Sequence, residues 1–170
     1  MMRLLGAVLV VAGCGALGLD GVARLNGRVR DLGELAAGLD ALQRELGWRL
    51  APLPLALEAA AEASHGPASQ FFSRCGRGVG QEDGRTFQQV WRGCLDAAQL
   101  RLAPGDRTLL ERLGPVLGRY DGDSQRLALE DAAAGLRDLQ GEASDDRRRL
   151  GRVYGVLGMT AGLFLAILLI

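Results

Sequence analysis

The chain contains no lysine and a single histidine, and its three cysteines show no CxxC spacing. Its twenty basic residues are therefore all arginines, and they balance twenty acidic residues to a formal charge of zero. A neutral chain has no bulk electrostatic attraction to nucleic acid. One histidine and an odd, scattered set of cysteines provide neither a zinc site nor a disulfide framework, so we predict no metal and no cofactor. Cys14, Cys75 and Cys94 are interpreted as small buried apolar side chains.

Residues for catalysis are also missing. His65 lies in the turn Ser64–Pro67 without an acidic or cysteine neighbour in sequence, and it is interpreted as a solvated turn residue. The glycine repeat Gly76–Gly80 follows no strand, so it does not fit a phosphate-binding loop and is interpreted as a flexible connector. We therefore expect a protein that is not an enzyme and has no small-molecule substrate.

A calcium loop is excluded in the same way. Asp121 and Asp123 resemble the first two ligands of an EF-hand loop. The sixth position of that loop requires glycine and the twelfth requires glutamate, but this chain has Arg126 and Ala132 there. The segment is instead predicted to be a turn, with Asp123 or Ser124 capping the helix that follows.

Charge is absent from both ends of the chain. Val153–Ile170 has no charged side chain, and as a helix it would span roughly 27 Å, close to one hydrocarbon core. Leu4–Leu19 is a second uncharged stretch, which would span about 24 Å. The sequence therefore predicts transmembrane helices at residues 4–19 and 153–170, with a helical domain at residues 20–152 between them, and contact with membrane lipids at both ends.

Arginines near the two apolar stretches predict the side of the membrane on which the middle domain lies. Four of them form a basic collar directly before the last stretch: Arg147, Arg148, Arg149 and Arg152. Three more follow the first stretch, whereas only Arg3 lies on its other side. The positive-inside rule therefore predicts a cytoplasmic domain with both termini outside.

A processed amino terminus is the alternative interpretation. Val11-Ala12-Gly13-Cys14 resembles a lipoprotein processing box, which would lipidate Cys14 and yield a lipid-anchored extracytoplasmic binding protein. The apolar run continues beyond Cys14 to Leu19, which favours an uncleaved helix. The intact mass of the mature protein distinguishes the two.

Between the ends, apolar residues recur at spacings of three and four, and no segment alternates polar and apolar residues. The first stripe contains Val22, Leu25, Val29, Leu32, Leu35, Leu39, Leu42 and Leu46. The last contains Leu129, Ala132, Leu136, Leu139, Ala143 and Leu150, and shorter apolar faces lie between the two. We expect an all-α fold: a bundle of about six helices, whose first and last helices extend into the transmembrane segments.

Several local sequences resemble the stage III sporulation protein AB family of endospore-forming bacteria, over nearly the whole chain. They include Leu4-Leu5-Gly6-Ala7, Glu45-Leu46-Gly47-Trp48, Pro52-Leu53 and, most strongly, Leu117-Gly118-Arg119-Tyr120-Asp121-Gly122-Asp123-Ser124-Gln125. The departures are Trp48, where tyrosine is commoner, together with Pro115 and the run Gly76–Gly80.

The resemblance implies a helical domain similar to the cytoplasmic domain of F-type platform proteins in type II secretion and type IV pilus machines. It implies a scaffold in the channel complex that links mother cell and forespore. It also implies a cytoplasmic partner, the secretion-type ATPase called stage III sporulation protein AA, and contacts with other proteins of the same channel. The expected location is the mother-cell membrane that faces the forespore.

Gly118, Asp121 and Gln125 lie in the strongest part of the resemblance and have two interpretations. Asp121 and Gln125 are four residues apart at a helix start, so they could face a partner together. Alternatively, Asp121 caps the helix and Gln125 satisfies backbone groups at the turn, and this structural interpretation is favoured.

Overall fold

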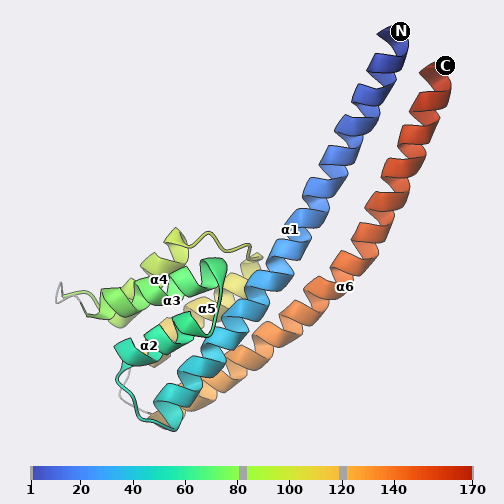
Figure 1. The fold of residues 1–170 in the computed structure, drawn as a ribbon. Coiled ribbons are helices and arrows are strands. Elements are labelled where there is room, and N and C mark those ends of the chain that lie inside the picture. The colour runs from blue at the N-terminus through green and yellow to red at the C-terminus, as the bar shows by residue number, and fades with distance from the viewer. Residues whose placement is uncertain (1, 81–83, 119–121, 170) are drawn as a thin grey trace. The chain divides into compact units, whose positions relative to one another are not determined.

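The computed structural model describes residues 2–80, 84–118 and 122–169, and all the regular structure in these ranges is α-helical (Figure 1). The helices are α1 (Met2–Gly47), α2 (Leu53–Glu62), α3 (Gly66–Val79), α4 (Phe87–Ala97), α5 (Pro104–Leu117) and α6 (Gly122–Leu169). The expectation of an all-α fold with about six helices is therefore confirmed within the described ranges.

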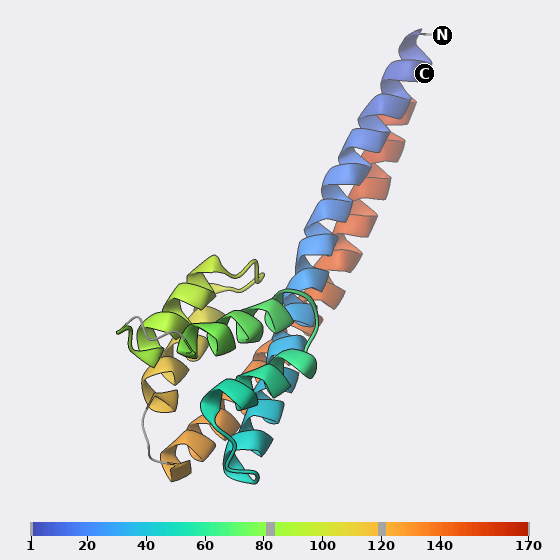
Figure 2. The same ribbon diagram turned by 60° about the vertical axis from the view of Figure 1, so that its left-hand side comes forward.

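The helices form two compact units, and α1 and α6 contribute to both. The unit from Arg28 to Gly141, called the bundle below, contains α2–α5 and the adjoining parts of α1 and α6. Two views show α2–α5 on one side of the paired α1 and α6 segments (Figures 1 and 2). The other unit contains α1 up to Gly27 and α6 from Glu142 onward, which run side by side with both termini at the same end (Figure 1).

Within the described residues, no helix combines the length and the apolar character needed to cross a bilayer. The spans predicted at residues 4–19 and 153–170, and the domain limits that they set, stay predictions. Nearly all the side chains of these two segments lie outside the described residues.

The two predicted apolar stripes form much of the core of the bundle. Leu32, Leu35, Leu39 and Leu42 of α1 are fully buried, as are Leu129 and Leu136 of α6. The aromatic side chains of α3 and α4 fill the space beside them. Phe71 and Trp91 pack edge to face with ring centroids 4.7 Å apart, and the indole Nε1–H of Trp91 donates to the Leu110 carbonyl at 2.8 Å. The indole N–H of the buried Trp91 therefore has a hydrogen-bond acceptor.

The segment Gly76–Gly80 is not the connector that the sequence predicts, because α3 continues through it to Val79. One of its glycines, Gly78, allows close packing that a side chain would prevent. Gly76 is buried against α2, and a Cβ atom on Gly78 would lie 2.5 Å from Cγ1 of Val90 in α4. The contacts with neighbouring helices offset the conformational cost of glycine in a helix.

Gly38 shows the same constraint inside α1. A Cβ atom there would lie 2.2 Å from Cε2 of the buried Phe72 ring, so α1 and α3 approach each other where α1 has no side chain. Gly141 in α6 is the contrasting case, since it is exposed and a Cβ atom would meet nothing within 4 Å.

We expect Gly38→Ala to lower the free energy of unfolding by about 1–3 kcal/mol, because the ring of Phe72 must move within a packed core. Gly141→Ala is the matched control and should raise it by up to about 1 kcal/mol, because alanine favours the helix. Urea unfolding of the full chain measures both. Equal effects of the two substitutions would contradict the packing assigned to Gly38.

Polar contacts connect α1 to the other helices of the bundle. Arg28 donates from Nε and Nη2 to the two oxygens of Asp106 in α5, both at 2.8 Å. Asp106 is fully buried, and its Oδ2 also accepts from the Ala103 backbone N–H at 2.8 Å. One turn along α1, Asp31 is also buried and accepts from the backbone N–H of Arg101 at 2.9 Å. These contacts fix the segment that leads into α5.

The charge of Asp106 is stabilised by its partners. Burial alone would raise the pKa of its carboxyl group, but hydrogen bonds from Arg28 and the Ala103 N–H and the charge of Arg28 outweigh burial, so the pKa lies below its ordinary value. A lowered folded-state pKa stabilises the fold at pH values above the unfolded-state pKa, about 3.9, and this contribution is lost as the pH falls toward the folded-state pKa.

We expect Asp106→Asn to lower the free energy of unfolding at pH 7 by about 1–3 kcal/mol, because the neutral amide cannot accept both guanidinium bonds as strongly. The difference from the unmodified protein should shrink as the pH falls from about 5 toward 3. Urea unfolding at several pH values measures this. Asp96→Asn is the control, since Asp96 is 58% exposed in its pair with Arg107 and should cost less than about 1 kcal/mol.

Candidate partner-binding site at the turn end of the bundle

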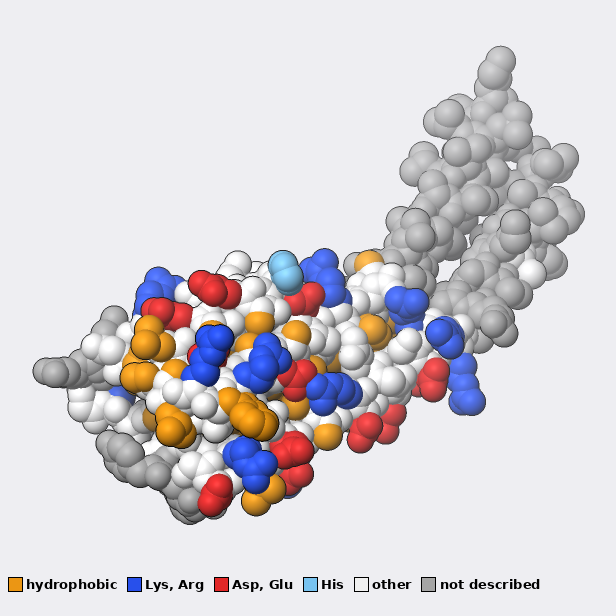
Figure 3. Space-filling model, turned by 60° about the horizontal axis from the view of Figure 1, so that its bottom comes forward, with side chains coloured by type: hydrophobic (Ala, Val, Ile, Leu, Met, Phe, Trp, Pro, Cys, Tyr) orange, Lys and Arg blue, Asp and Glu red, His pale blue; other side chains and the backbone are white. Residues whose placement is uncertain are grey.

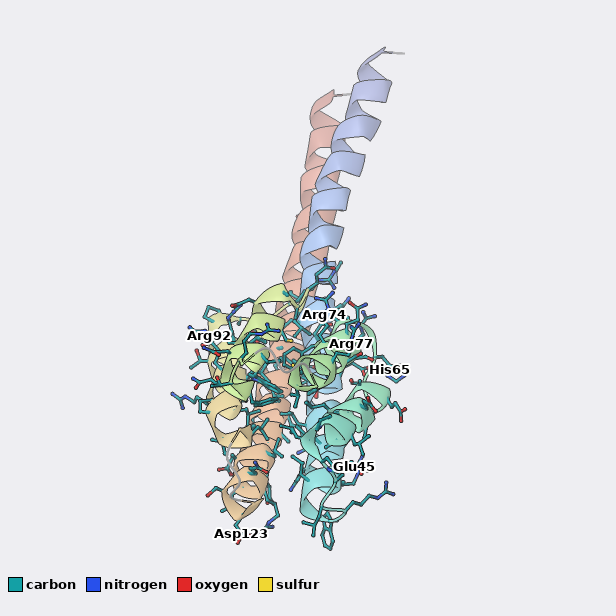
Figure 4. All side chains as sticks on the ribbon, turned by 90° about the vertical axis from the view of Figure 1, so that its left-hand side faces the viewer. Glu45, His65, Arg74, Arg77, Arg92 and Asp123 are labelled. Atoms are coloured by element: carbon teal, nitrogen blue, oxygen red, sulfur yellow. The ribbon has the colours of Figure 1, made fainter. Side chains whose placement is uncertain are left out.

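Four helix ends meet at one end of the bundle, which we call the turn end. They are the end of α1, the start of α2, the end of α5 and the start of α6, and residues from all four line one groove. Glu45 of α1 and Asp123 of α6 both lie at this end (Figure 4). The turn end therefore brings together residues that are about eighty positions apart in the chain.

The backbone after α1 folds back on the last turn of the helix. The N–H groups of Trp48 and Ala51 donate to the carbonyls of Arg44 and Glu45, each at 3.0 Å. Pro52 follows, and it restricts Ala51 to extended conformations and cannot continue a helix. These features end α1 and start α2 with a proline in its first turn.

Leu50 adopts a left-handed backbone conformation, with φ at +48°. This conformation costs a residue with a Cβ atom roughly 1–2 kcal/mol and is normally left to glycine. The Leu50 side chain is nevertheless 83% exposed, and the Trp48 side chain is 85% exposed. Backbone strain at Leu50 therefore occurs beside two large apolar side chains that are exposed to water. Strained backbone and exposed apolar side chains are both features of binding sites.

A groove of about 520 Å³ lies beside Leu50, which is one of its lining residues, whereas Trp48 is not. Its lining is mostly apolar and comes from the four helix ends, the segment that joins α1 to α2 and the adjoining helices: Leu46, Leu50, Ala51, Pro52, Leu53, Val79, Phe87, Leu117, Gly118, Gly122 and Gln125. Figure 3, in which the turn end comes forward, shows hydrophobic side chains in patches between charged ones. An apolar groove with a few polar groups suits an apolar side chain or a helix from a partner protein.

Gly118 and Gln125 line this groove, as part of the predicted site. The Gln125 Nε2–H donates to the Leu117 carbonyl at 3.0 Å and so joins α6 to the end of α5. Gly118 has a negative φ of −78°, and a Cβ atom there would make ordinary contact with Phe87, so its backbone does not demand glycine. Asp121 lies outside the described residues. Whether these three residues contact a partner stays a prediction.

The residues of the basic collar belong to the other unit. Arg147, Arg148 and Arg149 are exposed on α6, as residues that face water or lipid headgroups would be. The side chain of Arg152 lies outside the described residues, as does that of Cys14.

His65 has an acidic partner that the sequence does not reveal. Its backbone N–H donates to Oε2 of Glu34 at 2.7 Å, and its ring Nδ1 lies 3.1 Å from the same oxygen. His65 is exposed and directly precedes α3, so the Glu34 carboxylate caps the start of that helix. Among the described residues no group of three histidine, cysteine or acidic side chains could hold a metal ion.

Sequence reasoning missed Trp48 and Leu50 as site residues. The available signal was the register of Trp48, which lies outside the spacing of the apolar stripe that ends at Leu46, whereas Leu50 continues that spacing and gave no such signal. An apolar side chain placed off the buried face of a helix is one that the fold leaves exposed.

We expect Leu50→Gly to raise the free energy of unfolding by about 0.5–1 kcal/mol, because glycine removes the left-handed penalty and little burial is lost. Leu127→Gly is the control, since Leu127 is 54% exposed but lies within helix α6. There glycine should cost about 1 kcal/mol. Thermal or urea unfolding gives both values, and destabilisation by Leu50→Gly would contradict the strain assigned to Leu50.

Over the part of the chain that the structure describes, the fold is all-helical, with four short helices packed against two long ones. The sequence model of the family described as stage III sporulation protein AB matches residues 3–170. Stage III sporulation protein AB of Bacillus subtilis (strain 168) is 27% identical over 172 residues, which cover 99% of each chain. A solved structure of stage III sporulation protein AB superposes with a TM-score of 0.66 at 23% identity, over 72% of this chain and 98% of that one.

The chain therefore belongs to the stage III sporulation protein AB family. The names of the matched proteins describe a sporulation protein and no enzymatic activity.

Proposed function

We propose that the protein is a non-enzymatic scaffold of the sporulation channel between mother cell and forespore, and that it couples a cytoplasmic secretion-type ATPase to the membrane complex. Family membership supports a role in stage III sporulation. The observation that supports a docking role is the turn end, where the strained Leu50 lines the apolar groove and the exposed Trp48 lies two residues before Leu50 in the chain.

The turn end has the chemistry of a protein interface. Exposed tryptophan is among the residues that contribute most to binding when a partner covers it. Leu50 and Trp48 would be covered by the partner, and the groove that Leu50 lines would accept an apolar side chain or the face of a helix. Stage III sporulation protein AA, the ATPase of the same system, is the proposed partner.

The membrane attachment rests on the sequence. The uncharged stretches 4–19 and 153–170 would anchor the chain at both ends, and the collar Arg147–Arg149 with Arg152 would keep the bundle in the cytoplasm. Helices α1 and α6 each contribute to both compact units. A conformational change of the ATPase at the turn end would therefore reach the membrane along these two helices.

We expect Trp48→Ala to weaken the binding of the purified ATPase to the full-length protein by about 10-fold or more, because a fully covered tryptophan contributes at least about 1.4 kcal/mol. Leu127→Ala, which removes a different exposed apolar side chain within helix α6, is the control and should change the affinity less than about two-fold. Surface plasmon resonance in detergent measures both. Unchanged binding by Trp48→Ala would remove the turn end as the docking site.

The same assay separates the two interpretations of Asp121 and Gln125. If they contact the ATPase, Asp121→Ala and Gln125→Ala weaken binding while the fold is retained. If Gln125 only joins α6 to the Leu117 carbonyl, its substitution lowers the unfolding temperature and leaves the affinity of the folded protein unchanged.

A further inference from the structure

A second pocket, of about 440 Å³, lies between α3 and α4 and shares no lining residue with the groove of the turn end. It is lined by Arg74, Arg77, Gly78, Arg85, Val90, Gly93, Cys94 and Ala97. Three arginines surround it, and none of the described acidic side chains lines it. The described lining is therefore positively charged and suits an anionic ligand.

Two cysteines meet at this pocket. Cys94 of α4 is partly exposed and lines the pocket, whereas Cys75 of α3 is fully buried behind it. The two thiols lie close enough for each to shift the pKa of the other, and they are not joined as a disulfide. The interpretation of the cysteines as small buried apolar side chains agrees with the burial of Cys75, whereas Cys94 is only partly buried.

The environment makes the two thiols chemically unequal. The hydrogen bond from Cys75 lowers the pKa of the Cys94 thiol, burial opposes this, and the charges of Arg74, Arg85 and Arg77 lower it further, to about 7. The hydrogen bond with Cys94 and burial raise the pKa of Cys75 far above its ordinary value. Near neutral pH a substantial fraction of the partly exposed Cys94 is thus thiolate, while the buried Cys75 stays a thiol.

The arginines are placed to hold carboxylate groups. Arg74 and Arg77 lie on the same stretch of α3 (Figure 4). Arg74 donates from Nη1 to the Ala97 carbonyl at 3.1 Å, which holds its guanidinium at the pocket and leaves further N–H donors. Gly78 and Gly93 contribute no side-chain volume, and a Cβ atom on Gly93 would meet nothing within 4 Å. The pocket therefore has room beside Cys94 for a small charged molecule.

We propose that Cys94 is a thiol–disulfide exchange site for anionic low-molecular-weight disulfides, such as glutathione disulfide, and that Cys75 resolves the mixed disulfide. The arginines would bind the carboxylates of the small molecule and bring its sulfur–sulfur bond to Cys94. A product disulfide would join α3 to α4 inside the bundle. This proposal does not depend on the ATPase docking proposed above.

The reaction has two steps. In the first, the Cys94 thiolate attacks one sulfur of the small disulfide, the bond between its two sulfurs breaks, and one small thiolate leaves with the electron pair. In the second, the Cys75 sulfur attacks Cys94 in the mixed disulfide, and the second small thiol leaves with the proton from Cys75. Two protein thiols are oxidised, and one small disulfide is reduced to two small thiols.

Incubation of the purified full-length protein with glutathione disulfide at pH 7.5 tests the first claim by mass spectrometry. We expect the protein to lose two hydrogens, with the new bond mapped by peptide analysis to Cys75 and Cys94. Cys75→Ala should instead accumulate one glutathionyl group on Cys94, because alanine fills the buried site without resolving the intermediate. Cys94→Ser should leave Cys75 unmodified, because Cys75 is buried.

The unmodified protein makes this test decisive even if a cysteine variant fails to fold. Absence of a Cys75–Cys94 bond in the folded, unmodified protein would overturn the proposal. Alkylation of Cys94 by iodoacetamide should rise with a midpoint near pH 7 in the folded protein, and near 8.5 in urea. The pKa of Cys94 is set by four neighbouring titratable or charged groups: Arg74, Cys75, Arg77 and Arg85. The same midpoint in both states would contradict the proposed site.

The role of the arginines is tested by comparing two disulfides. Arg77→Gln should slow the reaction with glutathione disulfide about five-fold more than the reaction with neutral bis(2-hydroxyethyl) disulfide, because only the first carries carboxylates. Any change in the thiol pKa affects both reactions and cancels in the ratio. Arg92→Gln, on α4 but outside the pocket lining, is the matched control and should leave the ratio unchanged. An equal ratio in Arg77→Gln and the unmodified protein would overturn the recognition of anionic disulfides.

Discussion

The Arg28–Asp106 ion pair is the interaction on which the arrangement of the bundle depends most. Asp106 is fully buried, and without Arg28 it would be a buried charge that lacks compensation, which typically costs 3–5 kcal/mol. The same carboxylate accepts the Ala103 N–H and thereby sets the start of α5. Asp31 accepts the Arg101 N–H in the same region. Helix α1 therefore fixes the position of the segment that leads into α5.

Helix α1 consequently links the two features that we connect with function. Its final turn leads to the exposed Trp48 and the strained Leu50, and Gly38 in its middle permits the close approach of α3. Helix α3 in turn carries Cys75, whose partner Cys94 opens into the basic pocket. A protein with no catalytic machinery assigned to it would thus carry an apolar docking groove and, separately, a reactive thiol pair.

The sequence was sufficient for the features that depend on local periodicity. The stripes ending at Leu46 and beginning at Leu129 located α1 and α6 and much of the core, because burial follows the helical repeat. It was insufficient where a distant neighbour decides the outcome. Gly76 and Gly78 are helical because α2 and α4 pack against them, Glu34 and His65 meet across thirty-one positions, and Cys94 lies beside Cys75 only after α3 and α4 pack together.

Photo-crosslinking in sporulating cells tests most directly the central claim that a partner docks at the turn end. A photoreactive amino acid replaces Trp48 in one strain and Glu62, an exposed residue at the end of α2, in another. We expect crosslinks to stage III sporulation protein AA from position 48 and none from position 62. Crosslinks to the ATPase from position 62 alone, or from neither position while the two proteins co-purify, would contradict docking at the turn end.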